Sequence, residues 1–137
     1  MTALFADTFY WIALADSNDS AHHRALEITA ERSASAIVTT DEVLTEYLNY
    51  FSSAPEPLRH RAAYGVERLI ASSVRVIPQS RESFLAGVAL YGARPDKRYS
   101  LTDCISMRTM RRERLTEILT NDRHFEQEGF HALFRDS

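Results

Sequence analysis

Ala3-Leu4-Phe5-Ala6-Asp7 is the stretch that decides the fold, because an apolar run typical of a buried strand ends at a carboxylate. A second run with the same design, residues 118–121, is followed by Asp122. In open α/β sheets, ligands bind beyond the carboxyl ends of the strands. We therefore expect Asp7 and Asp122 to lie at one edge of a single sheet.

Strand and helix patterns alternate along the whole chain. Short apolar or β-branched runs predict strands at 3–6, 36–39, 74–77, 116–120 and 130–134. Helical periodicity predicts helices at 8–14, 20–32, 40–51, 58–71, 80–91 and 100–112. This alternation predicts an α/β fold, namely a three-layer α/β/α sandwich with a mostly parallel central sheet.

Two local signals set expected element boundaries. Thr39 and Glu42 have the spacing of a capping box, which predicts that the third helix begins there. The segment 52–57 contains two prolines and small polar residues, and it predicts a break before the next helix.

The composition is that of an ordinary globular protein. We expect residues 1–137 to form a single domain, because this length can bury a sufficient core. No apolar stretch reaches the roughly 20 residues of a membrane span. The first residues lack the pattern of a secretory signal, so we expect no membrane association and a cytoplasmic location.

Four acidic side chains form the candidate site. Asp7 and Asp122 follow strands, whereas Glu46 and Asp103 lie on helices that begin soon after a strand or a loop. Each has an ordinary explanation, since aspartates cap helices and stabilise turns, and a mid-helix glutamate is usually solvated. Close carboxylates, however, repel one another unless a cation lies between them. The set therefore predicts a divalent metal site.

Oxygen donors alone favour Mg²⁺ or Mn²⁺ at such a site. Cys104 is the only cysteine, which excludes a zinc cage made of cysteines. The histidines show no paired helical spacing, so a zinc enzyme is disfavoured, and we interpret His124 as a turn or capping residue. Thr8, Thr102 and Asn121 are candidates to hydrogen-bond the acids.

Four segments, residues 5–8, 40–47, 100–106 and 119–125, carry motifs in a recognisable order. Together they resemble the PIN domain, the nuclease fold of VapC-type toxins, over nearly the whole chain. The resemblance implies an α/β/α sandwich and an acidic cluster that binds Mg²⁺ or Mn²⁺. It assigns Asp7, Glu46, Asp103 and Asp122 to the catalytic and metal-binding positions, with Glu42 as a competitor for the position of Glu46.

The expected activity is metal-dependent endoribonuclease hydrolysis of RNA phosphodiester bonds. The resemblance also implies a cognate antitoxin and a homodimer. One alternative is a PIN-fold module that binds RNA or protein with little or no nuclease activity. A phosphatase that forms an aspartyl intermediate is disfavoured, because Phe9 occupies the position where such enzymes need a second aspartate.

Basic residues flank Asp103, although the net charge of −3 argues against a protein that coats nucleic acid through bulk attraction. They are candidates to bind RNA phosphates, or they form an ordinary solvated face. The set comprises Arg94, Lys97, Arg98, Arg108, Arg111 and Arg112.

Overall fold

The computed structural model describes residues 2–136. Its strands are β1 (Leu4–Ala6), β2 (Ile37–Thr40), β3 (Arg75–Ile77), β4 (Glu117–Leu119) and β5 (His131–Ala132). Its α-helices are α1 (Thr8–Ala15), α2 (His22–Glu31), α3 (Asp41–Tyr50), α4 (Glu56–Ile70), α5 (Arg81–Ala93), α6 (Leu101–Arg112) and α7 (Arg123–Gln127). Two short 3₁₀ helices span Ala34–Ala36 and Leu133–Arg135.

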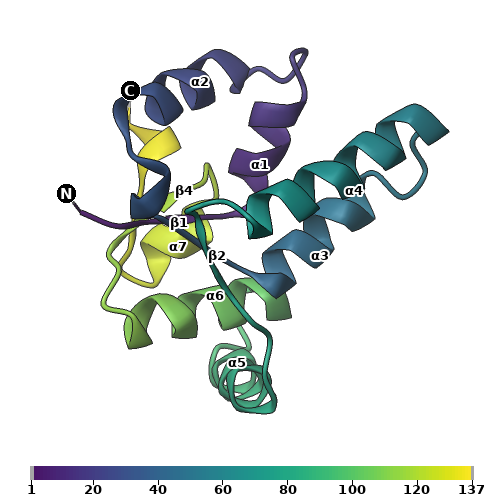
Figure 1. Cartoon of the computed structure of the whole chain (residues 1–137). Helices are drawn as coiled ribbons and strands as arrows, with labels where there is room; N and C mark the ends of the chain where they lie inside the picture. The colour runs from purple at the N-terminus through teal and green to yellow at the C-terminus, as the bar shows by residue number, and fades with distance from the viewer. Residues whose placement is uncertain (1, 137) are drawn as a thin grey trace.

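The five strands form one sheet in the order β3-β2-β1-β4-β5, and every pairing is parallel. Parallel neighbours need crossover connections, which the helices supply. Helices α1 and α2 lie on one side of the sheet and α5, α6 and α7 on the other, whereas the α3–α4 pair projects to one end (Figure 1). The predicted three-layer α/β/α fold with a parallel sheet is confirmed.

Alternate residues of the central strands fill two apolar layers. Leu4 packs in a cluster with Tyr10 of α1 and Ile28 of α2, whereas the next residue, Phe5, packs with Met107 of α6. All of these side chains are almost completely buried. Because the central strands are covered on both faces, their sequences read as continuous apolar runs rather than as polar and apolar alternation.

The start of α3 differs from the predicted capping box. Thr40 caps this helix, since its Oγ1 accepts a hydrogen bond from the backbone N–H of Val43 at 3.1 Å. Thr39 instead donates to the carbonyl of Ala6 at 2.8 Å and accepts from the indole of Trp11. Thr39 therefore ties β2 to β1, a tertiary contact that the local spacing could not show.

Two further boundaries also differ from the prediction. The predicted break at 52–57 is shorter, because α4 begins at Glu56 and holds Pro57 in its first turn, where proline costs no helical hydrogen bond. The predicted strand at 130–134 is reduced to two residues and continues as a 3₁₀ helix. Across residues 2–136, no helix is both long and apolar enough to cross a membrane.

Candidate active site

The carboxyl ends of β1 and β4 lie side by side, and each is followed by one of the predicted acids. The strand order reverses between these two strands, which is the point where open α/β sheets bind ligands. Asp7 directly follows β1, and Asp122 follows β4 after two residues. Thr120 links the two ends, because its Oγ1 donates to Asp7 Oδ2 at 2.8 Å.

Asp7 stands at the N-cap position of α1, but its side chain does not cap the helix by any hydrogen bond within the described residues. Its carboxylate is buried, with 7% of the residue exposed, and its partner is Thr120. The simple explanation of Asp7 as a helix cap is therefore insufficient.

Glu46 reaches the same place from the second turn of α3. Thr8, the first residue of α1, donates a short hydrogen bond from Oγ1 to Glu46 Oε1. Glu42 lies one turn earlier on the same helix and lines a different cavity, with Arg81 and Phe84. Of the two glutamates that compete for this position, Glu46 is the one that lies with the aspartates.

Asp103 and Asp122 act as caps as well as members of the acidic group. Asp103 closes a capping box at the start of α6, where its backbone N–H donates to Ser100 Oγ at 3.0 Å and its Oδ2 accepts from the Ser100 N–H at 3.4 Å. Asp122 Oδ1 accepts from the backbone N–H of His124 at 2.8 Å and caps α7. The capping interpretation of Asp103 is correct, whereas Asp122, which we interpreted as a turn residue, also caps a helix. These contacts fix both side chains at the edge of the sheet.

All four acids line one open cavity of about 430 Å³, which we call the acidic cavity. Thr8 and Asn121, two of the three residues predicted to support the acids, also line it, whereas Thr102 does not. The remaining lining residues are Phe9, Ser100 and Thr120. Side chains that are far apart in sequence thus meet in one polar depression.

Burial and the charges of neighbouring carboxylates raise the pKa values of two of these acids, Asp7 and Asp103. Burial, followed by the nearby charge of Asp103, raises the pKa of Asp7 from 3.8 to about 7, against the opposing hydrogen bond from Thr120. Burial and the charge of Asp122 raise the pKa of Asp103 to about 6. A bound cation would offset both effects, because it stabilises the ionised forms.

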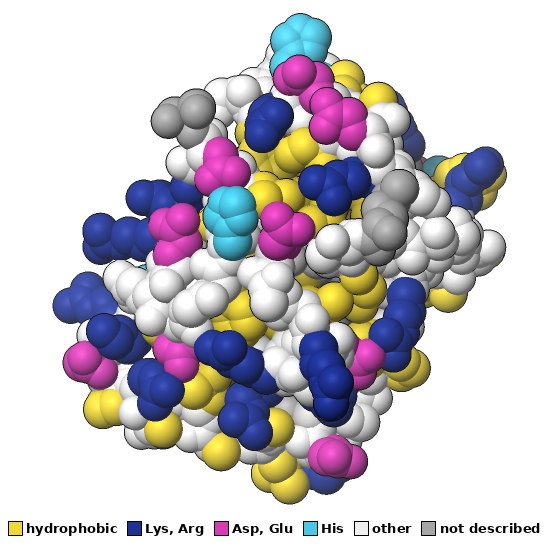
Figure 2. All heavy atoms as spheres, turned by 90° about the vertical axis from the view of Figure 1, so that its left-hand side faces the viewer, with side chains coloured by type: hydrophobic (Ala, Val, Ile, Leu, Met, Phe, Trp, Pro, Cys, Tyr) yellow, Lys and Arg dark blue, Asp and Glu magenta, His cyan; other side chains and the backbone are white. Residues whose placement is uncertain are grey.

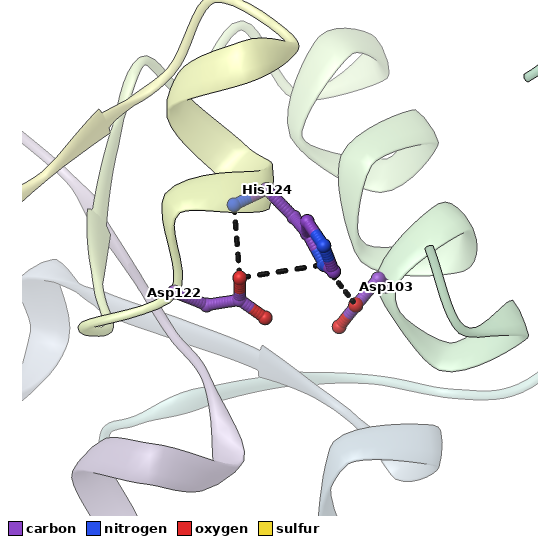
Figure 3. A group of neighbouring side chains, drawn as sticks. All are labelled: Asp103, Asp122 and His124. Carbon is purple, nitrogen blue, oxygen red and sulfur yellow. Dashed lines mark hydrogen bonds and ion pairs between the residues drawn. The ribbon is translucent and has the colours of Figure 1, made fainter. Parts of the chain in front are cut away.

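His124 joins the group, which the sequence interpretation did not foresee. Its Nδ1 lies 3.4 Å from Asp122 Oδ1 and 3.7 Å from Asp103 Oδ2 (Figure 3). The imidazole comes from the first turn of α7 and rests against the ring of Tyr99, with 5.3 Å between the ring centroids. The only signal in the sequence was its position two residues after Asp122.

The basic residues lie apart from the acidic cavity. Arg94, Arg108, Arg111 and Arg112 line a second cavity of about 530 Å³ between α5 and α6, which we call the arginine cavity. Figure 2 shows many lysine and arginine side chains over the lower half of one face. Helices α5 and α6 lie in the corresponding lower part of Figure 1. None of the predicted RNA-binding residues lines the acidic cavity.

Several of these basic side chains are already engaged. Arg94 forms an ion pair with Glu128 at 2.8 Å, and Arg111 lies 4.4 Å from the ring centre of Phe130. Lys97 lies 3.9 Å from its neighbour Asp96. Arg112 forms an ion pair with Glu113 at 3.4 Å. By contrast, Arg98 and Arg108 are exposed.

The family model of the PIN domain matches residues 4–130. The chain belongs to the PIN domain family. The expected resemblance is therefore confirmed, and the matched residues include all four acids and His124. A comparison with curated protein sequences found no significant match.

Two solved structures share this PIN fold over nearly their whole lengths. VapC20 of Mycobacterium tuberculosis, described as a Sarcin-Ricin loop cleaving toxin, is 26% identical, with a TM-score of 0.80 over 93% of this chain and 96% of that chain. FitAcB from Neisseria gonorrhoeae is 13% identical, with a TM-score of 0.73 over 94% of this chain and 95% of that chain. The VapC20 match supports membership of a toxin–antitoxin nuclease family, whereas the FitAcB match shows the fold alone.

Proposed function

We propose that this PIN domain is a metal-dependent endoribonuclease, the toxin of a toxin–antitoxin pair, which hydrolyses RNA phosphodiester bonds. The observation that carries this proposal is the convergence of Asp7, Glu46, Asp103 and Asp122 in the acidic cavity. Such a group, at the point where the strand order reverses, has the chemistry of a cation site for phosphate esters.

The side chains fit a small divalent cation. Carboxylate oxygens are the ligands that Mg²⁺ and Mn²⁺ prefer. Burial, and then the charge of a neighbouring carboxylate, raises the pKa values of Asp7 and Asp103, and a cation would oppose both effects. When bound, the cation supplies a water activated for attack and neutralises charge that develops on the phosphate.

The chain itself contributes fixed positions for these oxygens. Thr120 orients Asp7, Thr8 orients Glu46, and the capping box at the start of α6 orients Asp103. Each of these contacts is a hydrogen bond from a side chain or a helix end. The carboxylates therefore need little reorientation when the substrate binds. Asp122 is the most exposed of the three aspartates, and we assign it to an outer position or to a second, weaker cation.

RNA is the substrate that the comparison favours, because VapC20 is described as cleaving the Sarcin-Ricin loop. We propose that Arg108 in the arginine cavity contacts flanking phosphates, since it is exposed there. Arg112 in the same cavity is a second candidate, which would have to share its ion pair with Glu113. Lys97 and Arg98 in the preceding loop are further candidates, whereas Arg94 and Arg111 would have to share their present partners. We also propose a cytoplasmic location, a cognate antitoxin and a homodimer.

The test compares RNA cleavage by the wild type with cleavage by Asp103→Asn, Glu46→Gln and Glu42→Gln, in Mg²⁺ and after EDTA. Asparagine keeps an acceptor for the Ser100 N–H, so Asp103→Asn should fold. We expect the first two variants to lose at least about 100-fold in rate, the scale of losing one group that stabilises a transition state. Glu42→Gln is the matched control, because it lies on the same helix but lines another cavity.

EDTA should abolish the wild-type cleavage. Cleavage that survives EDTA, or that is equally fast in Asp103→Asn and in the wild type, would contradict the proposal. RNA binding without any cleavage by the wild type would indicate the alternative, a binding module that retains the fold.

A further inference from the structure

His124 places a nitrogen donor among the oxygen donors of the acidic group. Its Nδ1 faces one oxygen of Asp122 and one of Asp103, and the close-up shows the imidazole edge turned toward both carboxylates (Figure 3). These three donor atoms all lie within 4.8 Å of one another. The three side chains come from α6, from the loop after β4 and from α7.

The separations suit ligands of a common ion better than they suit hydrogen bonds. At 3.4 Å and 3.7 Å, the Nδ1 to oxygen distances exceed those of normal N–H···O bonds, which are about 2.7–3.2 Å. Atoms that each lie about 2.0–2.2 Å from one cation are roughly 2.9–3.5 Å apart in octahedral or tetrahedral arrangements. A cation between the three groups therefore requires only small side-chain adjustments.

The imidazole is held in this orientation from two sides. Asp122 Oδ1, the oxygen nearest to Nδ1, also accepts the backbone N–H of His124, which fixes the start of α7. On the other side, the buried ring of Tyr99 packs against the imidazole and donates its O–H to Glu128 at 2.8 Å. Glu128 is in turn held by Arg94. These contacts hold the imidazole edge toward the two carboxylates.

We propose that His124 supplies Nδ1 as a nitrogen ligand to a cation shared with Asp103 and Asp122, and that this ligand makes the site select Mn²⁺ over Mg²⁺. Imidazole suits transition metals, whereas Mg²⁺ prefers oxygen. The proposal rests on the metal site of the proposed function, but that function requires only oxygen ligands. The two can therefore fail separately.

The test measures Mn²⁺ binding to the metal-free full-length protein by electron paramagnetic resonance, with pulsed detection of coupling to nitrogen. Wild type should show the coupling of one imidazole nitrogen, and protein labelled with ¹⁵N-histidine should show the ¹⁵N pattern instead. His124→Gln should lose the coupling and at least about tenfold in Mn²⁺ affinity. Its affinity for Mg²⁺, measured by calorimetry, should change less than twofold.

His131→Gln is the matched control, because this histidine forms an exposed ion pair with Asp136 away from the acidic cavity. It should bind Mn²⁺ like the wild type. Wild-type Mn²⁺ without nitrogen coupling, or coupling that persists in His124→Gln or disappears in His131→Gln, would overturn the inference. Even if His124→Gln folds poorly, labelling shows whether a histidine binds the ion, and His124 is the histidine that lies beside Asp103 and Asp122. Magnesium-dependent RNA cleavage by the same wild-type preparation would then leave the proposed function intact.

Discussion

Asp7 is a buried aspartate whose ionised form is disfavoured in the folded protein. Its pKa is about 7 in the folded chain, because of burial first and the charge of Asp103 second, against 3.8 for an ordinary aspartate. The folded state therefore retains the proton in a range where the unfolded state has lost it. The free energy of unfolding of the metal-free protein should fall as the pH rises from about 4 to about 7.

Asp7→Asn should remove the larger part of this dependence, and the raised pKa of Asp103 should account for the rest. At pH 7.5 and without metal, we expect the variant to be more stable than the wild type by a few kcal/mol, at about 1.4 kcal/mol for each unit of pKa shift. The difference should shrink toward pH 4. Urea unfolding in EDTA at several pH values measures it, with the exposed Asp96→Asn as a control. A difference that does not vary with pH would refute this electrostatic explanation.

The three aspartates could be predicted from their sequence positions, because a strand end or a helix start is a local feature. Glu46 lies inside a helix and was assigned through the family resemblance. The local explanation of Asp103 was also correct, since it caps α6, whereas Asp122, interpreted as a turn residue, caps α7. What could not be predicted is that one residue does both, or that His124 faces Asp103. That pairing depends on how α7 packs beside α6, and no spacing in the sequence encodes it.

The α5 and α6 pair depends on a close approach at Gly87. A Cβ atom at this position would lie 3.2 Å from the backbone nitrogen of Ile105 and would collide with the Ile105 side chain. Gly87→Ala should therefore force the helices apart and lower the free energy of unfolding by about 1–3 kcal/mol.

Gly92→Ala is the matched control on the same helix, because a Cβ atom there meets nothing within 4 Å. It should stabilise the protein by up to about 1 kcal/mol through helix propensity. Thermal and urea unfolding of both variants measures the contrast. Equal effects of the two substitutions would show that the close approach does not determine stability here.

Element types followed from the sequence more securely than element ends. Periodicity identified the helices, but Thr39 and Thr40 are locally equivalent candidates for a cap. A tertiary contact distinguishes them, because the Thr39 hydroxyl donates a hydrogen bond to the carbonyl of Ala6 on the neighbouring strand. Likewise, the strand predicted at 130–134 keeps two residues, because the chain continues as a 3₁₀ helix from Leu133.

The segment after Phe130 lies beyond the matched family region, yet it completes the sheet. Strand β5 pairs with β4, Leu133 is buried, and Phe134 packs edge-to-face on Phe9 with 5.0 Å between ring centroids. The backbone N–H of Phe134 also donates to the carbonyl of Thr120, the residue that holds Asp7. The tail therefore helps to hold Thr120, which in turn positions Asp7 in the acidic cavity.

A chain that ends at Phe130 should lose at least about 3 kcal/mol of stability, because it gives up the burial of Leu133 and most of the Phe134 contacts. Asp136→Asn in the full chain should change stability by less than about 1 kcal/mol, since the ion pair with His131 is exposed. Urea unfolding compares the two. A shortened chain as stable as the full one would show that the tail is dispensable.

At the scale of the whole molecule, alternation of elements was enough to predict a parallel sheet with helices on both sides. The order of the strands was not. Strand β1 is central and pairs with β4, and this order depends on how the crossover connections pack in the complete fold. The β1–β4 pairing brings Asp7 beside Thr120.

The pairing of β1 with β4 has a consequence for folding during synthesis. Thr120 and Asp7 are 113 positions apart, so Asp7 leaves the ribosome long before its hydrogen-bond partner has been made. Strand β1 can pair with β2 early, but the opposite edge of β1 must wait for β4. A growing chain thus has no complete acidic cavity until β4 and the residues up to Asp122 have been synthesised.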